Sequence, residues 1–124
     1  MKDRRTSYNK DMDGLREVIP KIISTLEPLN PYKIILFGSL TKKNRNQGND
    51  IDIAVILDSN SLPSSFEERM ENAILVEEYL FDLSLIYPID ITVYTKKEYE
   101  KLKEQKKSFI AELNLGETIY DRAS

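Results

Sequence analysis

Apolar residues recur at helical spacing near the beginning of the chain. Between residues 15 and 26 they fall at positions i, i+3, i+4, i+7, i+8 and i+11 and form one stripe: Leu15, Val18, Ile19, Ile22, Ile23 and Leu26. This pattern predicts an amphipathic helix, which Pro20 is expected to kink or to divide into two pieces. Pro28 and Pro31 predict its end, because the residue before a proline avoids helical backbone. The polar residues 1–12 are expected to be flexible.

Four segments are predicted to be β-strands. Three are short apolar runs with β-branched residues, and the fourth is a short segment that follows Gly116; they are residues 32–37 (YKIILF), 51–57 (IDIAVIL), 89–94 (IDITVY) and 118–120. The intervening residues 40–50 and 58–65 are polar and rich in turn-forming residues, so we expect them to be loops.

Two further helices are predicted after the second strand. Apolar residues at helical spacing, with Glu and Arg between them, predict a helix over about residues 65–85. Another, over residues 95–113, begins with a capping box formed by Thr95 and Glu98. The element order predicts an α/β or α+β fold, with one mixed sheet of three to four strands and helices packed mainly on one face. The helix between the second and third strands would allow those two strands to be parallel.

Composition narrows the possible chemistry. A chain of 124 residues suits one domain that spans residues 1–124. The net charge of −3 and the pI near 5.1 argue against nucleic-acid binding over the whole surface, although they leave a local basic patch open. Because the chain has no Cys and no His, catalysis must use carboxylates, hydroxyls, Lys or a hard cation. No apolar run approaches the ~20 residues that span a bilayer, and no apolar segment follows the basic start, so we expect a cytoplasmic protein without a signal peptide.

Polar residues that can carry chemistry gather at the ends of three predicted strands. Gly38 and Ser39 follow the first strand, and Asp50 and Asp52 lie at the start of the second. Residues two apart in a strand share a face, so these two carboxylates point the same way. They repel each other unless a cation lies between them, and Mg²⁺ prefers oxygen ligands. Asp90 adds a third carboxylate if its strand lies beside the second, which predicts a site for one or two Mg²⁺ ions.

The segment after the first strand has features of a phosphate-binding loop. A glycine directly after a strand lets backbone N–H groups approach a phosphate, and the Ser39 hydroxyl adds a hydrogen-bond donor. Lys42, Lys43 and Arg45 can neutralise a triphosphate, and an ordinary solvated loop is the equally weighted alternative for these cations. The joint pattern of Gly-Ser, ten residues and Asp-x-Asp is far more specific than either piece alone.

These motifs together resemble a known family. Leu36-Phe37-Gly38-Ser39, followed after ten residues by Asp50-Ile51-Asp52-Ile53-Ala54-Val55, is similar to the signature of the minimal nucleotidyltransferases of the DNA polymerase β superfamily, which also includes the kanamycin nucleotidyltransferases. The resemblance covers about residues 15–121 and implies a nucleotidyltransferase fold.

The resemblance also implies a role for each site residue. Gly38 and Ser39 would hold the β- and γ-phosphates of an NTP, and Asp50 and Asp52 would bind Mg²⁺. Asp90 would bind the catalytic metal and help to deprotonate the acceptor hydroxyl. Family members usually carry an Arg-Gly pair a few residues after the serine, where this chain has Lys42-Lys43. A lysine can still contact a phosphate, but as a point charge and not as a bidentate fork.

The expected function is Mg²⁺-dependent transfer of a nucleoside monophosphate, AMP from ATP, to a hydroxyl. No added substrate domain is recognisable, so we expect the acceptor on a partner protein or in a cleft completed by a homodimer. The resemblance implies that this partner is a small helical HEPN-domain toxin, an RNase, and that the chain is its antitoxin. One alternative is a non-catalytic module that neutralises a partner by binding, which the Lys42-Lys43 departure favours. Another is an aminoglycoside-like small-molecule nucleotidyltransferase, which needs an acidic surface such as the Glu-rich residues 67–78.

Overall fold

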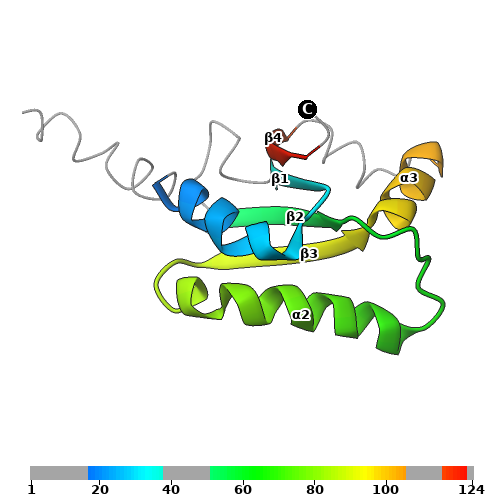
Figure 1. The fold of residues 1–124 in the computed structure, drawn as a ribbon, viewed down its shortest axis with the longest axis horizontal. Coiled ribbons are helices and arrows are strands. Elements are labelled where there is room, and N and C mark those ends of the chain that lie inside the picture. The colour runs from blue at the N-terminus through cyan, green and yellow to red at the C-terminus, as the bar shows by residue number, and fades with distance from the viewer. Residues whose placement is uncertain (1–16, 38–50, 106–115, 123–124) are drawn as a thin grey trace, which may run out of the picture.

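The computed structural model describes residues 17–37, 51–105 and 116–122, which form a four-stranded sheet with three helices around it (Figure 1). The chain is helical over residues 17–26, and a 3₁₀ turn, η1, follows. The other elements follow in chain order after η1 (Glu27–Leu29): β1 (Lys33–Phe37), β2 (Ile51–Leu57), α2 (Phe66–Ser84), β3 (Ile89–Thr95), α3 (Lys96–Gln105) and β4 (Glu117–Asp121). All four strands expected from the sequence are present.

The sheet is mixed, as the element order predicts. Its strand order is β3-β2-β1-β4. β1 runs antiparallel to both of its neighbours, whereas β2 and β3 are parallel and are connected through α2. A β-bulge between Ile34 and Ile35 shifts the register of β1 with β4. The parallel pairing of β2 with β3 is the arrangement on which the expected role of Asp90 depends.

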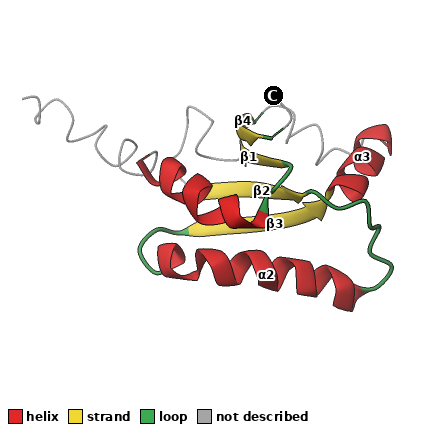
Figure 2. Cartoon of the chain, viewed as in Figure 1, coloured by secondary structure: helices red, strands yellow, loops and turns green. Residues whose placement is uncertain are grey.

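The two faces of the sheet carry separate apolar cores. The larger core lies on the face covered by helix 17–26 and α2, which we call the two-helix face; its buried residues are Val18, Ile22, Leu26, Ile34, Leu36, Ile51, Ile53, Val55, Leu57, Val76 and Leu80. The smaller core lies on the opposite face, the α3 face, and consists of Ile35, Phe37, Ala54, Ile56 and Tyr99. Figure 2 shows α3 near the C-terminal ends of β2 and β3, apart from the other two helices. The helices therefore lie mainly on one face, as expected.

Side-chain caps fix where two of the helices begin. The Ser65 hydroxyl accepts a hydrogen bond from the Glu68 N–H at 3.2 Å and caps α2. At α3, the Thr95 hydroxyl accepts from the Glu98 N–H at 3.1 Å, and the Glu98 carboxylate accepts from the Thr95 N–H at 2.9 Å. The capping box predicted from the sequence is confirmed. The predicted helix 95–113 is described as far as Gln105, and its remainder lies outside the described residues.

Of the two alternatives expected for Pro20, a kink or a division of the helix, the described residues exclude the division. Residues 17–26 are helical without a break, so Pro20 does not divide the helix there. A proline lacks the N–H that would donate one helical hydrogen bond, but the N–H groups from residue 21 onward are still available to donate theirs. The helix does end where the prolines predict: η1 contains Pro28, and Asn30 adopts a left-handed conformation with φ of 50° before Pro31.

Candidate active site

Asp52 and Asp90 lie side by side in the sheet. In the parallel pairing of β2 with β3, Asp52 is in register with Asp90. Ile51 and Ile53, the neighbours of Asp52, both point into the core of the two-helix face. Because successive side chains in a strand alternate, Asp52 points to the α3 face, and the same alternation places Asp90 on that face. The topology thus brings together two carboxylates that are far apart in the chain.

The electrostatics of this pair favour a bound cation. Neighbouring strands lie ~4.8 Å apart, so two carboxylates in register on one face repel each other. Asp52 is partly buried, which reduces the screening of that repulsion by water, whereas Asp90 is exposed. A divalent cation that contacts both groups removes the repulsion, and the all-oxygen donor set suits a hard ion such as Mg²⁺.

The described residues contribute two carboxylates to this site, those of Asp52 and Asp90. Within residues 17–37, 51–105 and 116–122, no group of three or more His, Cys, Asp or Glu side chains is placed to hold a metal ion. Asp50, the other predicted ligand, lies outside the described residues, as do Gly38, Ser39 and the loop cations Lys42, Lys43 and Arg45. Their predicted roles remain predictions.

The end of β1 indicates on which side of the carboxylates the phosphate loop begins. Phe37, the last residue of β1, is in register with Asp52 in the antiparallel β1–β2 pair. Gly38 follows Phe37 directly in the sequence, so the chain leaves the sheet beside Asp52. β3 and Asp90 flank β2 on its other side. The described end of β1 at Phe37 and Asp90 on β3 therefore lie on opposite sides of Asp52.

A pocket lies farther along the α3 face, toward the C-terminal end of β3. Its volume is about 410 Å³, and its walls come from α2, β3, α3 and the loop before α2: Leu62, Pro63, Arg69, Tyr94, Glu98, Lys101, Leu102 and Gln105. Tyr94 is four residues beyond Asp90, so both side chains point to the same face, ~13 Å apart along the strand. The sequence did not reveal this pocket, because its residues come from separate elements and form no local motif.

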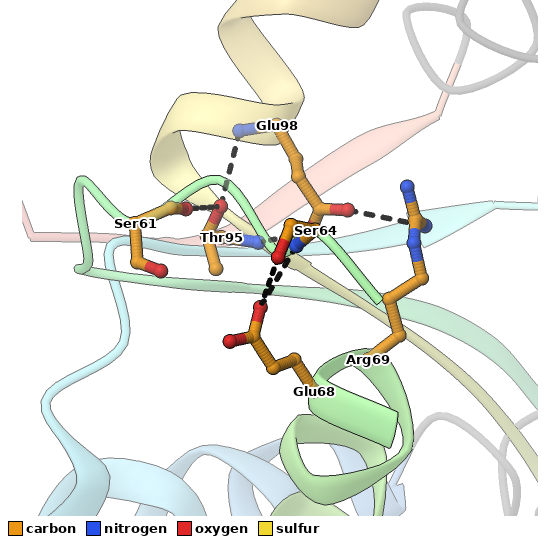
Figure 3. Close-up of polar contacts among 6 residues, drawn as sticks. All are labelled: Ser61, Ser64, Glu68, Arg69, Thr95 and Glu98. Atoms are coloured by element: carbon orange, nitrogen blue, oxygen red, sulfur yellow. Dashed lines mark hydrogen bonds and ion pairs between the residues drawn. The ribbon is translucent and has the colours of Figure 1, made fainter. Parts of the chain in front are cut away.

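A network of hydrogen bonds holds the pocket wall together (Figure 3). The buried Glu98 accepts a hydrogen bond from the Thr95 N–H with one carboxylate oxygen and pairs at 3.1 Å with the Arg69 guanidinium through the other. The Thr95 hydroxyl donates to the Ser61 carbonyl at 2.7 Å. Nearby, the Ser64 N–H donates to the Glu68 carboxylate at 2.8 Å. Glu98 thus links α3 and β3 to α2.

This environment strengthens the preference of the Tyr94 phenol for its protonated form. Burial raises the pKa of Tyr94 above its ordinary value of 10.0, and the negative charge of Glu98 raises it further. The Arg69 guanidinium opposes these two effects and lowers the pKa. The phenol is therefore a neutral hydrogen-bonding group at physiological pH.

In the described part of the chain, no helix is both long and apolar enough to cross a membrane.

Comparison with known proteins assigns this chain and its fold to a family. Neither the curated proteins nor the solved structures give a match. The model of the family described as "Polymerase beta, Nucleotidyltransferase" matches residues 20–123. That match includes Gly38, Ser39 and all three predicted carboxylates, and it agrees with the mixed sheet and helices described above. The chain therefore belongs to the polymerase β nucleotidyltransferase family.

Proposed function

We propose that the protein transfers a nucleoside monophosphate from an NTP, ATP in the first instance, to a hydroxyl group on a partner protein. The observation that carries this proposal is the register of Asp52 with Asp90 on one face of the sheet, in a chain of the nucleotidyltransferase family. In the reaction, the acceptor oxygen forms a bond to the α-phosphorus as the bond from that phosphorus to the β-phosphate oxygen breaks. Pyrophosphate leaves, and the acceptor proton passes to a carboxylate.

Each predicted site residue has a part in this chemistry. Asp52 and Asp90, with Asp50, would hold Mg²⁺, and the ion would supply positive charge to compensate the triphosphate and the leaving pyrophosphate. The resemblance also implies that Asp90 accepts the proton of the acceptor hydroxyl, and its exposure on the side of β2 away from β1 leaves it accessible to an acceptor. Gly38 and Ser39 bind the β- and γ-phosphates, and Lys42 and Lys43 compensate their charge.

The order of the strands supports binding of the two substrates on opposite sides of Asp52. The phosphate-binding segment follows β1, so the NTP lies on the β1 side of Asp52. β3 is at the edge of the sheet, so the acceptor hydroxyl reaches Asp90 from that edge. The pocket around Tyr94 lies on the same face and offers room for a neighbouring part of the acceptor. Its phenol, guanidinium and ammonium groups suit polar or acidic groups there.

ATP labelled on its α-phosphate tests the proposal directly, because only this phosphate stays with the transferred AMP. Purified protein with Mg²⁺ is incubated with a lysate from its own source, and label transfer to protein is followed on a gel. We expect Asp52→Asn and Asp90→Asn to abolish transfer, because each removes a carboxylate charge from the metal site. Glu100→Gln removes one charge from the exposed surface of α3 and should leave transfer unchanged. Absence of Mg²⁺-dependent labelling, or full labelling by Asp52→Asn, would contradict the proposal.

The biological role that we propose is that of an antitoxin. The partner is then a small helical HEPN-domain RNase, and modification of its hydroxyl silences it. The replacement of the family's usual Arg-Gly pair by Lys42-Lys43 favours a second role, in which the chain neutralises its partner by binding alone. Co-expression of the toxin with an Asp50→Asn/Asp52→Asn double variant separates the two roles. Loss of neutralisation supports the catalytic role, whereas full neutralisation supports binding.

A further inference from the structure

α2 exposes a row of large apolar side chains along its length. The sheet covers only a narrow side of the helix, on which Val76 and Leu80 are buried. Beside that buried side lies a row of exposed residues, which we call the α2 stripe: Phe66 (74% exposed), Met70 (40%), Ile74 (44%), Phe81 (57%) and Leu85 (70%). Their spacing of four, four, seven and four residues keeps them on one side of the helix over ~28 Å. A run of exposed apolar side chains of this length is typical of a protein interface.

A row of carboxylates borders the α2 stripe on its solvent side. These residues follow the stripe residues by one or four positions, and all are exposed: Glu67, Glu71, Glu78 and Asp82. No Lys or Arg lies between them on that side of the helix, since Arg69, the one basic residue of α2, points toward Glu98. An occupant of the stripe therefore meets apolar contacts next to a strip of negative charge.

A hollow in the stripe adds a more specific feature. Its volume is about 370 Å³, and it is lined by Ile74, Glu77, Glu78 and Phe81. Ile74 and Phe81 contribute apolar surface to this hollow, and the two glutamates contribute negative charge. A Lys or Arg side chain matches this combination, because its methylene stem packs on apolar groups while its cationic end reaches the carboxylates.

We propose that the α2 stripe is a docking site for an amphipathic helix of a partner protein, with an apolar ridge bordered by Lys and Arg. One basic side chain of that helix occupies the hollow between Ile74 and Phe81. Charge complementarity selects this occupant over a second copy of the chain. In a two-fold antiparallel pair of α2 helices, each flanking row meets its own equivalent, so the carboxylate row of one copy would face that of the other.

Docking at this site leaves the carboxylate pair accessible. α2 packs on the two-helix face, whereas Asp52 and Asp90 point to the α3 face. The docking proposal does not depend on catalysis. It rests on the proposed function only where the docked partner is taken to be the acceptor protein. A partner held on α2 would then reach Asp90 around the β3 edge, since α2 packs against β3.

The test measures peptide binding by fluorescence anisotropy. The probe is a labelled 18-residue model helix with Leu at helical spacing on one face and Lys elsewhere. Two controls are a peptide of the same composition in scrambled order and an amphipathic peptide with Glu in place of Lys. We expect the basic amphipathic helix to bind at least about tenfold more tightly than either control, because only it combines apolar area with positive charge.

Adjacent substitutions on α2 locate the binding site. Ile74→Ser and Leu75→Ser are matched changes, because these side chains are 44% and 39% exposed and point to different sides of the helix. Ile74→Ser should weaken binding about tenfold, whereas Leu75→Ser should leave it unchanged. Circular dichroism confirms that both variants are folded. Asp52→Asn should bind the peptide normally, so a failed transfer assay and a failed docking site give different results.

Three results would overturn the proposal. Equal affinity for the scrambled peptide would show that charge alone drives binding. Equal weakening by Ile74→Ser and Leu75→Ser would place the site elsewhere. Sedimentation that shows a dimer of the chain, lost in Ile74→Ser, would identify a second copy as the occupant of the stripe.

Discussion

Replacing Glu98 by alanine removes the group that joins α3 and β3 to α2. Glu98 is 5% exposed, accepts the Thr95 N–H at 2.9 Å and pairs with Arg69 at 3.1 Å. Loss of a capping interaction costs about 1 kcal/mol, and a buried N–H left without a partner costs about 1–3 kcal/mol. Both figures describe the same lost bond, so we expect about 2 kcal/mol from it. The pair with the 57% exposed Arg69 side chain is screened by water and adds at most ~1 kcal/mol.

Glu98→Gln separates these two contributions. Its amide oxygen can still accept the Thr95 N–H, so only the ion pair with Arg69 is lost and we expect a cost of about 0.5 kcal/mol. Glu98→Ala should cost about 2–3 kcal/mol, which lowers the midpoint of urea unfolding by about 1 M. Glu104→Ala, an exposed change on the same helix, is the control. Equal destabilisation by Glu98→Ala and Glu98→Gln would refute the reasoning, because the ion pair and not the capping bond would then dominate.

Two further predictions concern Tyr94 and the core. The raised pKa of Tyr94 contributes stability that is fully present below pH ~10, where the unfolded tyrosine ionises, and that is lost as the pH rises from there through the folded pKa. Tyr94→Phe should therefore show a smaller loss of stability between pH ~9.5 and ~11 in urea titrations, and an unchanged pH profile would contradict the assigned burial. Leu80→Ala should cost about 2–5 kcal/mol of unfolding free energy, because Leu80 is fully buried in the core of the two-helix face. Leu75→Ala, on the exposed side of α2, should cost under ~1 kcal/mol. Equal shifts of the urea midpoint by the two variants would contradict the side of α2 that packs on the sheet.

Most elements of this fold follow from local patterns in the sequence. Three of the strands are short apolar runs with their own turn signals, and β2 (Ile51–Leu57) is predicted to the residue. The capping box of Thr95 and Glu98 is likewise local, because both groups lie in one turn. Strand order and faces are set by tertiary packing, which explains why the β-bulge in β1 and the place of α3 opposite the other helices were not foreseen.

The candidate site is likewise predictable in part from local sequence and in part only from tertiary structure. The joint motif identifies Asp52, and alternation gives its direction, but its proximity to Asp90 depends on the pairing of two strands separated by α2. The contact of Arg69 with Glu98 has no sequence signal, since the two residues come from different helices and each resembles an ordinary surface charge. Glu98 was identified only as a cap, and its role in the pocket appears with the tertiary structure.

The parallel pairing of β2 with β3 makes the carboxylate pair insensitive to the length of the chain between them. Register, and not sequence separation, sets Asp90 beside Asp52, so the loop before α2 can gain residues without moving either side chain. β3 itself has no such tolerance. If the buried face of Ile91 and Val93 keeps the rest of β3 in register, a single residue inserted between Asp90 and Ile91 would move Asp90 back by one position and turn it to the two-helix face, where isoleucines now pack. Natural variation in length should therefore fall in the loops around α2 and avoid the start of β3.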